Sequence, residues 1–339
     1  MTDGRSLKLL AALACLVWAL FVIAPFWWVG VTAFKAPTDV NGGPTYLPWI
    51  DFSPTLATFR DIVAGRRGDF LRAFWNSSAI AVSATFLSVL LGSMAAYALV
   101  RFTFRIRLVS GLVFAVAAIG GFLLFNKVAG FATPQALGLS LAAALPASLL
   151  INRLPLPGPV LGNSDISFWF ISQRMFPPIV SAFALFLFYA ELNKQGVRLL
   201  DNYWGMVLAY TAFGLPLAVW LMADFFRAVP VEVEEAALVD NVPHLRIFFE
   251  IVMPMVRPGT LATFMIILAF IWNEFLFALL LTTSRWQTLP VVLAGQNSSR
   301  GDEWWAISAA TMISIVPMLV VAALLGRMMR SGLLTGSIK

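Results

Sequence analysis

The sequence has few charged residues and almost no cysteine or histidine for its length. Only 12% of its 339 residues are charged, whereas 60% are hydrophobic and the mean hydropathy is +0.85. So few charges cannot cover a soluble globular domain, and the composition therefore predicts an integral membrane protein. The single cysteine, Cys15, excludes a disulfide within the chain and a thiol metal cluster, and the single histidine, His244, excludes an HExxH metal site.

The sequence also lacks the motifs of catalysis and of nucleotide binding. It contains no P-loop and no Ser/His/Asp set, and the stretches between its apolar segments are too short for a soluble catalytic domain. We therefore expect no catalytic residue, no bound cofactor and no metal. The net charge of +6 is typical of basic residues at the cytoplasmic edge of a bilayer, so it requires no nucleic acid to explain it.

Long apolar segments dominate the sequence. A helix needs about 20 apolar residues to cross a bilayer. Eight segments are candidates: 9–34, 74–100, 108–126, 135–151, 166–190, 203–224, 259–283 and 304–326. The sequence predicts an all-α polytopic helical bundle with about eight transmembrane helices, forming a single domain over 1–339. Segment 135–151 is the least typical because it is short and contains Pro146.

Basic residues beside these segments predict the orientation of the chain. They lie before the first segment, after the second and after the last: Arg5 and Lys8; Arg101, Arg105 and Arg107; Arg327, Arg330 and Lys339. Lys and Arg are enriched in the cytoplasmic loops of membrane proteins, so we expect both termini on the cytoplasmic side of a bacterial inner membrane. The long loop 35–73 is also basic, but long loops carry less weight in this rule.

Charged residues gather again in the loop 225–258. Residues 231–240 favour a helix, and Glu232 and Glu234 lie in its first turn, where the helix dipole stabilises acids. Asn241 then tolerates the left-handed conformation that ends many helices. The loop is predicted to begin with a short helix that stops at this asparagine.

A second short helix is predicted to follow. Pro243 can open it, and we expect it to run to about Ile251 and to end at Pro254 and Pro258. The resulting hairpin would present small residues that another protein can approach closely: Ala236, Ala237 and Leu238. An ordinary amphipathic surface helix is the simpler alternative.

The sequence EAALVDNVPHLRIFFEIVMP (235–254) resembles the cytoplasmic EAA loop of ATP-binding-cassette (ABC) importer permeases. The family pattern, E-A-A-x-x-D-G-A and then I-x-x-P, is matched in register by Glu235, Ala236, Ala237, Asp240, Ile251 and Pro254. Asn241 stands where the family usually has glycine. The resemblance implies that the loop couples to an ATPase subunit, and the residues assigned to this role also include Glu234, Leu238, Asn241 and His244.

Further motifs resemble the carbohydrate-importer permeases of the maltose MalG type. They are Asn76-Ser77-Ser78, Tyr97 to Phe102, Met175-Phe176-Pro177, Leu215-Pro216, Trp272 to Phe275, Thr288-Leu289-Pro290 and the tail from Gly332 to Lys339. The link between Arg105 and Met175 is longer than in that family. Residues 108–165 are therefore interpreted as an insertion that adds two spans to a six-helix permease core.

The resemblance implies a transport subunit whose ATP hydrolysis takes place elsewhere. The implied partners are a second permease of different sequence, two ATPase subunits that bind ATP and Mg²⁺, an extracytoplasmic solute-binding protein and the lipid bilayer. The chain would then convert the movement of the ATPases into opening and closing of a solute path.

Candidate residues of the solute path lie within the apolar segments. Glu274 is an acid in segment 259–283, where a charge costs about 2.5–3.5 kcal/mol, so it should face the interior of the bundle. Glu274 and its neighbours Trp272 and Asn273 either line the path or join helices by hydrogen bonds, and the sequence leaves both possibilities open. Three aromatic residues could stack on a sugar ring, although packing explains most aromatics equally well: Phe176, Tyr210 and Phe213.

Three functions compete at this level. The first is an importer permease for a sugar, polyol or glycerol-like solute; the second is an importer permease for glycerol phosphate or a polyamine; the third is a secondary transporter. Polyamine-type permeases tend to carry Leu-Gly-Ala after the acidic helix, where this chain has Val239-Asp240-Asn241, and this favours a sugar-type solute. A secondary transporter has no need of an EAA loop.

Overall fold

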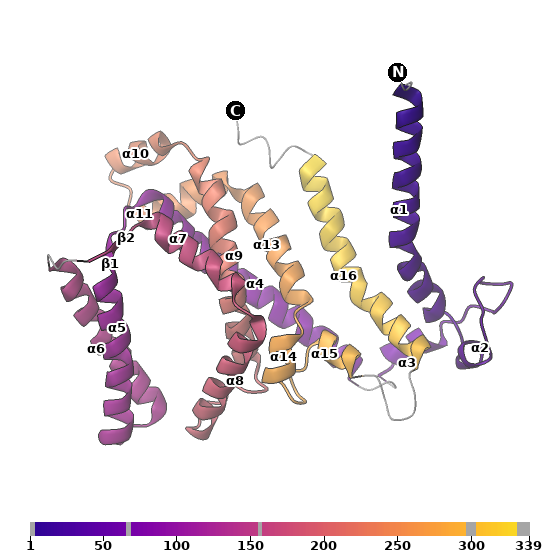
Figure 1. Ribbon diagram of the computed structural model, residues 1–339, viewed down its shortest axis with the longest axis horizontal. Coiled ribbons are helices and arrows are strands. Elements are labelled where there is room, and N and C mark those ends of the chain that lie inside the picture. Colours follow the sequence, from indigo (N-terminus) through magenta and orange to yellow (C-terminus); the bar gives the residue numbers. More distant parts are fainter. Residues whose placement is uncertain (1–3, 66–68, 155–157, 296–302, 331–339) are drawn as a thin grey trace. The chain divides into compact units, whose positions relative to one another are not determined.

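The structure is a computed structural model that describes residues 4–65, 69–154, 158–295 and 303–330. Over these ranges the regular elements are helices, together with a two-stranded sheet and an isolated bridge, and loops join them (Figure 1). The all-α class predicted from the sequence is confirmed. The tail motif 332–339 lies outside the described residues. The chain divides into two compact units, 1–76 with 288–320 and 77–287 with 321–339.

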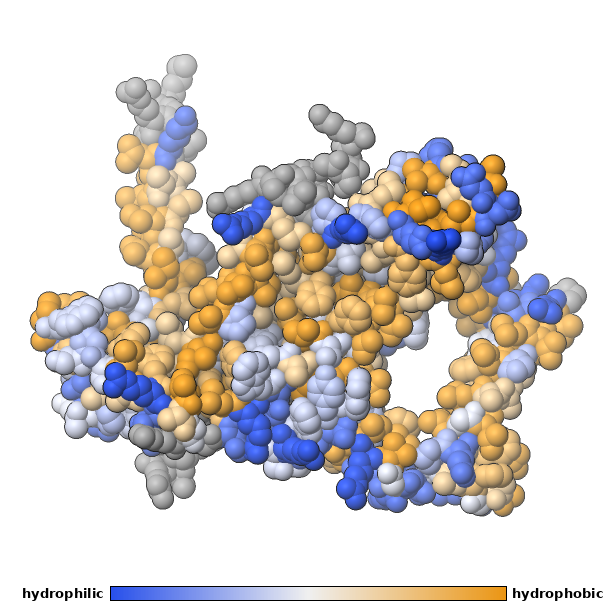
Figure 2. All heavy atoms as spheres, turned by 180° about the vertical axis from the view of Figure 1, so that it is seen from behind, coloured by the Kyte–Doolittle hydropathy of each residue, from blue (hydrophilic) through white to orange (hydrophobic). Residues whose placement is uncertain are grey.

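The first unit contains a long apolar helix and several short ones. Its long helix is α1 (Gly4–Ala33), which contains Pro25. The short helices are α2 (Pro37–Asn41), α3 (Ala57–Val63) and α15 (Leu289–Ala294). The last long helix, α16 (Trp304–Arg330), begins in this unit. The surface of α1 is almost entirely hydrophobic, as expected for a helix in contact with lipid (Figure 2).

The core of the second unit is formed by three long helices. These are α4 (Phe70–Arg101), whose residues from Ser77 onward belong to this unit, α9 (Tyr203–Arg227) and α13 (Arg257–Trp272). A Cβ atom on Gly92 of α4 would lie 2.4 Å from the Cβ of Ala218 in α9. Gly92 is therefore required for the close approach of the two helices, as is common between membrane helices.

Residues 108–153 form a helical hairpin of their own. Helix α5 (Leu108–Leu123) continues into a π-helical turn, η1 (Leu124–Val128), and α6 (Thr133–Arg153) returns alongside it. The base of the hairpin is closed by antiparallel strands β1 (Ile106–Arg107) and β2 (Val160–Leu161). Hydrophobic side chains cover most of its surface (Figure 2). Residues 108–153 thus form a distinct structural element, and their assignment as an insertion stays a prediction.

Two segments predicted as single spans are broken helices. Segment 166–190 consists of α7 (Asn163–Ser172), a 3₁₀ turn η2 (Gln173–Met175) and α8 (Pro178–Lys194), with a bend of 92° between the two parts. The cause is the Pro177-Pro178 pair, because a proline forces the residue before it, Phe176, into an extended conformation (φ −72°, ψ 136°).

Segment 259–283 is also interrupted. Helix α13 ends at Trp272, and the short helix α14 (Leu276–Leu281) begins only after Asn273, Glu274 and Phe275. Six described helices are long and apolar enough to cross a membrane, and two bent helix pairs can each supply one more. The prediction of a polytopic bundle with about eight spans agrees with this range.

Candidate functional site

The loop 225–258 folds into the predicted hairpin. Its first helix is α10 (Val231–Val239), and Asn241 follows with a positive φ of 59°. The Asn241 N–H donates to the carbonyl of Leu238 and the Val242 N–H to that of Ala237, both at 3.0 Å. This pattern is a Schellman motif, so the asparagine ends the helix as a glycine would.

The second arm of the hairpin is longer than the sequence suggested. It comprises α11 (His244–Arg246), a π-helix η3 (Ile247–Val252) and α12 (Met253–Met255). The expectation that Pro254 ends this arm is wrong, because the widened π-helical turns before it accommodate its missing N–H. The chain instead bends by 83° at Val256, and Pro258 opens α13 rather than closing the arm.

A buried ion pair attaches α10 to the end of α4. The Arg101 Nε atom donates to Glu234 Oε1 at 2.6 Å, and the Tyr97 hydroxyl donates to Glu234 Oε2 at 2.6 Å. Arg101 also donates from Nη2 to the Val229 carbonyl at 2.7 Å. The two charged side chains are only 11% and 7% exposed. Glu234 therefore faces the helices of its own chain and does not lie on the outer surface of the hairpin.

Apolar packing surrounds this ion pair. A buried cluster joins the ends of α4 and α9 to both arms of the hairpin: Ala96, Tyr97, Val219, Met222, Ala223, Phe226, Val229, Ala237, Ile247, Phe248, Val252 and Val256. The rings of Tyr97 and Phe248 lie 5.1 Å apart, and that of Phe226 lies 5.7 Å from Tyr97. The hairpin is thus held to two spans by a common core.

The hairpin residues assigned to ATPase coupling divide between two faces. Ala237 is 8% exposed and belongs to the cluster, so the expectation of a small surface containing this residue needs correction. Six others are exposed: Glu235, Ala236, Leu238, Asp240, Asn241 and His244. Ile251 and Pro254 are half-buried on the second arm. The His244 ring also lies 5.5 Å from that of Phe102, at the end of α4.

Two adjoining cavities lie at the helix breaks. The first, of about 370 Å³, is lined at the bend between α7 and α8 by Gln173, Arg174, Phe176, Pro178 and Ser181, together with Phe213 of α9. The second, of about 630 Å³, is lined by Asn273, Glu274 and Phe275 at the second break and again by Pro178 and Phe213. Four of the six predicted path residues, Phe176, Phe213, Asn273 and Glu274, therefore line these cavities.

The other two predicted path residues are buried. Tyr210 is 1% exposed and donates from its hydroxyl to the Glu274 backbone carbonyl at 3.3 Å. Trp272 is 7% exposed at the end of α13. Their rings are packed within the protein and do not line either cavity.

The carboxylate of Glu274 caps a helix. Its Oε1 accepts from the N–H of Leu276 at 2.8 Å and of Phe277 at 3.0 Å, and its Oε2 accepts from Phe277 at 3.2 Å and Ala278 at 3.4 Å. These are the N–H groups that a helix start leaves without partners. The geometry is that of an acid that joins the two halves of a broken helix by hydrogen bonds, the second of the two roles that the sequence leaves open.

Arg174 was not singled out from the sequence. Its guanidinium carbon lies 5.4 Å from the centroid of the Phe213 ring and 5.1 Å from that of Phe270. Its Nη1 atom is buried and has no hydrogen-bond partner among the described residues. A lone arginine in the apolar stretch 166–190 was the available signal, because ionisable residues inside membrane segments are costly and are usually retained for function.

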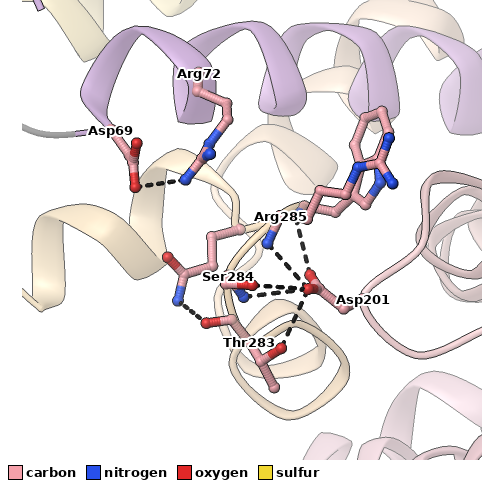
Figure 3. A network of polar contacts seen from close by, with 8 residues as sticks. Asp69, Arg72, Asp201, Thr283, Ser284 and Arg285 are labelled. Atoms are coloured by element: carbon pink, nitrogen blue, oxygen red, sulfur yellow. Dashed lines mark hydrogen bonds and ion pairs between the residues drawn. The ribbon is translucent and has the colours of Figure 1, made fainter.

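Asp201 organises the loop at the opposite end of α9. Its carboxylate accepts from the N–H of Arg285 at 3.0 Å and of Trp286 at 2.9 Å, and from the hydroxyls of Thr283 and Ser284 at 3.2 Å (Figure 3). Burial alone would raise the pKa of Asp201, but the backbone donors outweigh it and hold the pKa below its usual value. The contribution of the Asp201 carboxylate to the stability of the folded protein is complete above the ordinary pKa of aspartate. It is lost as the pH falls through the lowered pKa.

Comparisons with known proteins identify the family. Residues 164–331 match the family of binding-protein-dependent transport system inner membrane components. A putative ABC transporter permease of Streptomyces antibioticus is 39% identical over 172 residues, which are 50% of this chain and 73% of the relative. The chain belongs to this permease family. It is an ABC importer permease, a multi-pass inner membrane component that is not itself an ATPase.

Other similar proteins extend over nearly the whole permease. A trehalose/maltose transport system permease of Thermococcus litoralis is 26% identical, with 98% of this chain and 97% of the relative covered. A solved bacterial ABC transporter, involved in the import of the acidic polysaccharide alginate, contains a chain with a TM-score of 0.61 and 16% identity, covering 96% of this chain and 98% of that one. The similarity to this solved structure shows the fold alone.

The ion pair between the hairpin and α4 yields the first prediction. Glu234→Ala leaves the guanidinium of Arg101 buried without its carboxylate, and breaking such a pair costs about 3–5 kcal/mol. We expect the purified permease to unfold at a clearly lower temperature, as measured by intrinsic fluorescence. Glu235→Ala removes the same side chain from the exposed neighbouring position and is the matched control. Equal melting temperatures for the two variants would contradict the assignment.

The helix cap yields the second prediction. Glu274→Gln retains an oxygen that accepts from the N–H groups of α14, whereas Glu274→Leu leaves them without a partner at a cost of about 1–3 kcal/mol. We expect Gln to preserve the yield of folded permease in detergent size-exclusion chromatography and Leu to lower it. A normal yield for Leu would exclude the capping role.

Proposed function

We propose that this permease forms part of the translocation path of an importer for sugar-type solutes and is driven through its 231–255 hairpin. One observation carries the coupling part of the proposal. The hairpin is anchored to α4 by the Glu234–Arg101 pair and to α9 by a common apolar core, while its outer face remains exposed. A partner that binds this face can therefore move two spans together.

The exposed face of the hairpin has the character of a docking surface. On α10 it carries Glu235, Ala236 and Val239, the last being 80% exposed. The second arm adds the exposed apolar side chains of Leu245 and Phe249. Exposed apolar residues beside small and acidic ones are typical of a protein interface. ATP and Mg²⁺ would be bound by two ATPase subunits docked on this face and on that of the partner permease.

The remaining arrangement follows from this assignment. The hairpin and both termini would lie in the cytoplasm, and the loop held by Asp201 would lie on the outer side, where a solute-binding protein delivers its cargo. A second permease would complete the path. The ATPases would then switch the pair between outward- and inward-facing states, because each state offers them different contacts.

The solute class is supported by the relatives and by the cavities. Relatives of this chain are named as permeases for trehalose/maltose, diacetylchitobiose and sulfoquinovosyl glycerol. The first cavity combines aromatic rings with the hydrogen-bond donors of Gln173 and Arg174, a combination that suits a hydroxylated ring. A polyamine is disfavoured because Arg174 would repel it. Glycerol phosphate remains compatible with the same residues.

A bulky substitution on the exposed face tests this coupling. Ala236→Trp places an indole on the outer side of α10, where it should prevent close approach of an ATPase without disturbing the permease core. We expect the ATPase subunit to be lost from the purified complex and solute-stimulated ATP hydrolysis to fall to background.

The control for this variant is Ala129→Trp, the same change at an exposed alanine after η1, which should leave the complex intact. Ala237→Trp is unsuitable because Ala237 is buried against the permease's own core. Retention of the ATPase together with full hydrolysis in Ala236→Trp would refute docking at this face.

A further inference from the structure

The cavity at the bend between α7 and α8 has an unbalanced charge. Arg174 lies in its wall, and no Asp or Glu is among the residues that line this cavity. The buried Nη1 of Arg174 has no hydrogen-bond partner among the described residues. A guanidinium ordinarily finds a carboxylate or phosphate for its planar fork of donors. Among the described residues, the contacts of this guanidinium are the faces of Phe213 and Phe270.

The residues that line the Arg174 cavity add further donors and no acid, and one acid, Glu274, lines the adjoining cavity. Gln173 and Ser181 line the same cavity, and α8 begins beside them at Pro178 without an acidic residue in its first turn. The other broken helix differs, because the start of α14 is neutralised by the carboxylate of Glu274. In transporters built with broken helices, the half-helix starts commonly face anionic groups of the substrate.

We propose that Arg174 is the centre of an anion subsite in the solute path and binds a carboxylate, sulfonate or phosphate group carried by the sugar-type solute. The aromatic rings of Phe176 and Phe213, which line the same cavity, contact the sugar ring. Arg174 thereby determines specificity for acidic over neutral sugars. The inference rests on the proposed function, in which these cavities belong to the path.

A matched pair of probes isolates the charge. Glucuronate and glucose share the same ring and differ in the carboxylate, so their binding to the purified, fully assembled complex can be compared by isothermal titration calorimetry. We expect glucuronate to bind at least about tenfold more tightly than glucose to the wild type. Arg174→Gln should abolish the difference, and Arg174→Lys should retain part of it because it keeps the charge and loses the fork.

Arg153→Gln, which removes an exposed arginine at the end of α6, is the control and should bind like the wild type. Equal affinity for the two probes in the wild type, or an unchanged preference in Arg174→Gln, would overturn the subsite. If Arg174→Gln lowers the yield of complex while the wild type shows no preference, the guanidinium pairs with the second permease instead. Failure of the proposed function is distinguishable, because it would remove ATPase association and solute-stimulated hydrolysis from the wild type itself.

Discussion

The attachment of the 231–255 hairpin to the membrane helices depends on one buried carboxylate. Glu234 is neutralised by Arg101 and hydrogen-bonded by Tyr97, so both of its oxygens have partners in a buried site. Removing one partner from such a pair leaves a charge that the interior cannot solvate. Separating Glu234 from Arg101 is therefore costly, and the two side chains are held in one arrangement. The cluster around Phe226 and Phe248 closes over the pair and extends the contact to α9. Under the proposed coupling, a force applied to the exposed face would reach two spans.

The second constraint is the interruption of two helices inside the apolar region. Breaking a helix in a membrane leaves backbone groups without partners, and such breaks are tolerated only where protein or a cavity satisfies them. At the second break Glu274 supplies the missing acceptors for α14. At the first, the extended residue before Pro177 turns the chain and places Arg174 in a cavity. The cavities at the two breaks share Phe213 and Pro178 in their walls. Arg174 and Glu274 therefore lie in the same part of the second unit.

Much of this arrangement follows from local rules that the sequence displays. Two predictions rest on such rules and are confirmed: the left-handed residue that ends α10 at Asn241, and the helical conformation of the long apolar segments. The inward direction of Glu234 could not be predicted, because Glu234 and Glu235 are equivalent in helix propensity and the deciding partner, Arg101, lies 133 residues away. The bend at Pro177 has a sequence signal in the double proline, and the capping of α14 has one in Glu274, an acid before an apolar run. The apolar composition of both segments nevertheless favours unbroken spans.

In the proposed coupling, the hairpin and the ends of α4 and α9 move as one body when the ATPases close. Spin labels can be attached to Glu232→Cys of α10 and Asp224→Cys of α9, two exposed positions, in a Cys15→Ser background. Pulsed electron paramagnetic resonance then measures the distance between the two labels. We expect the same distance distribution in nucleotide-free and ATP-bound complexes. A shift of that distribution on ATP binding would show that the hairpin moves independently of the helices and would rule out rigid coupling.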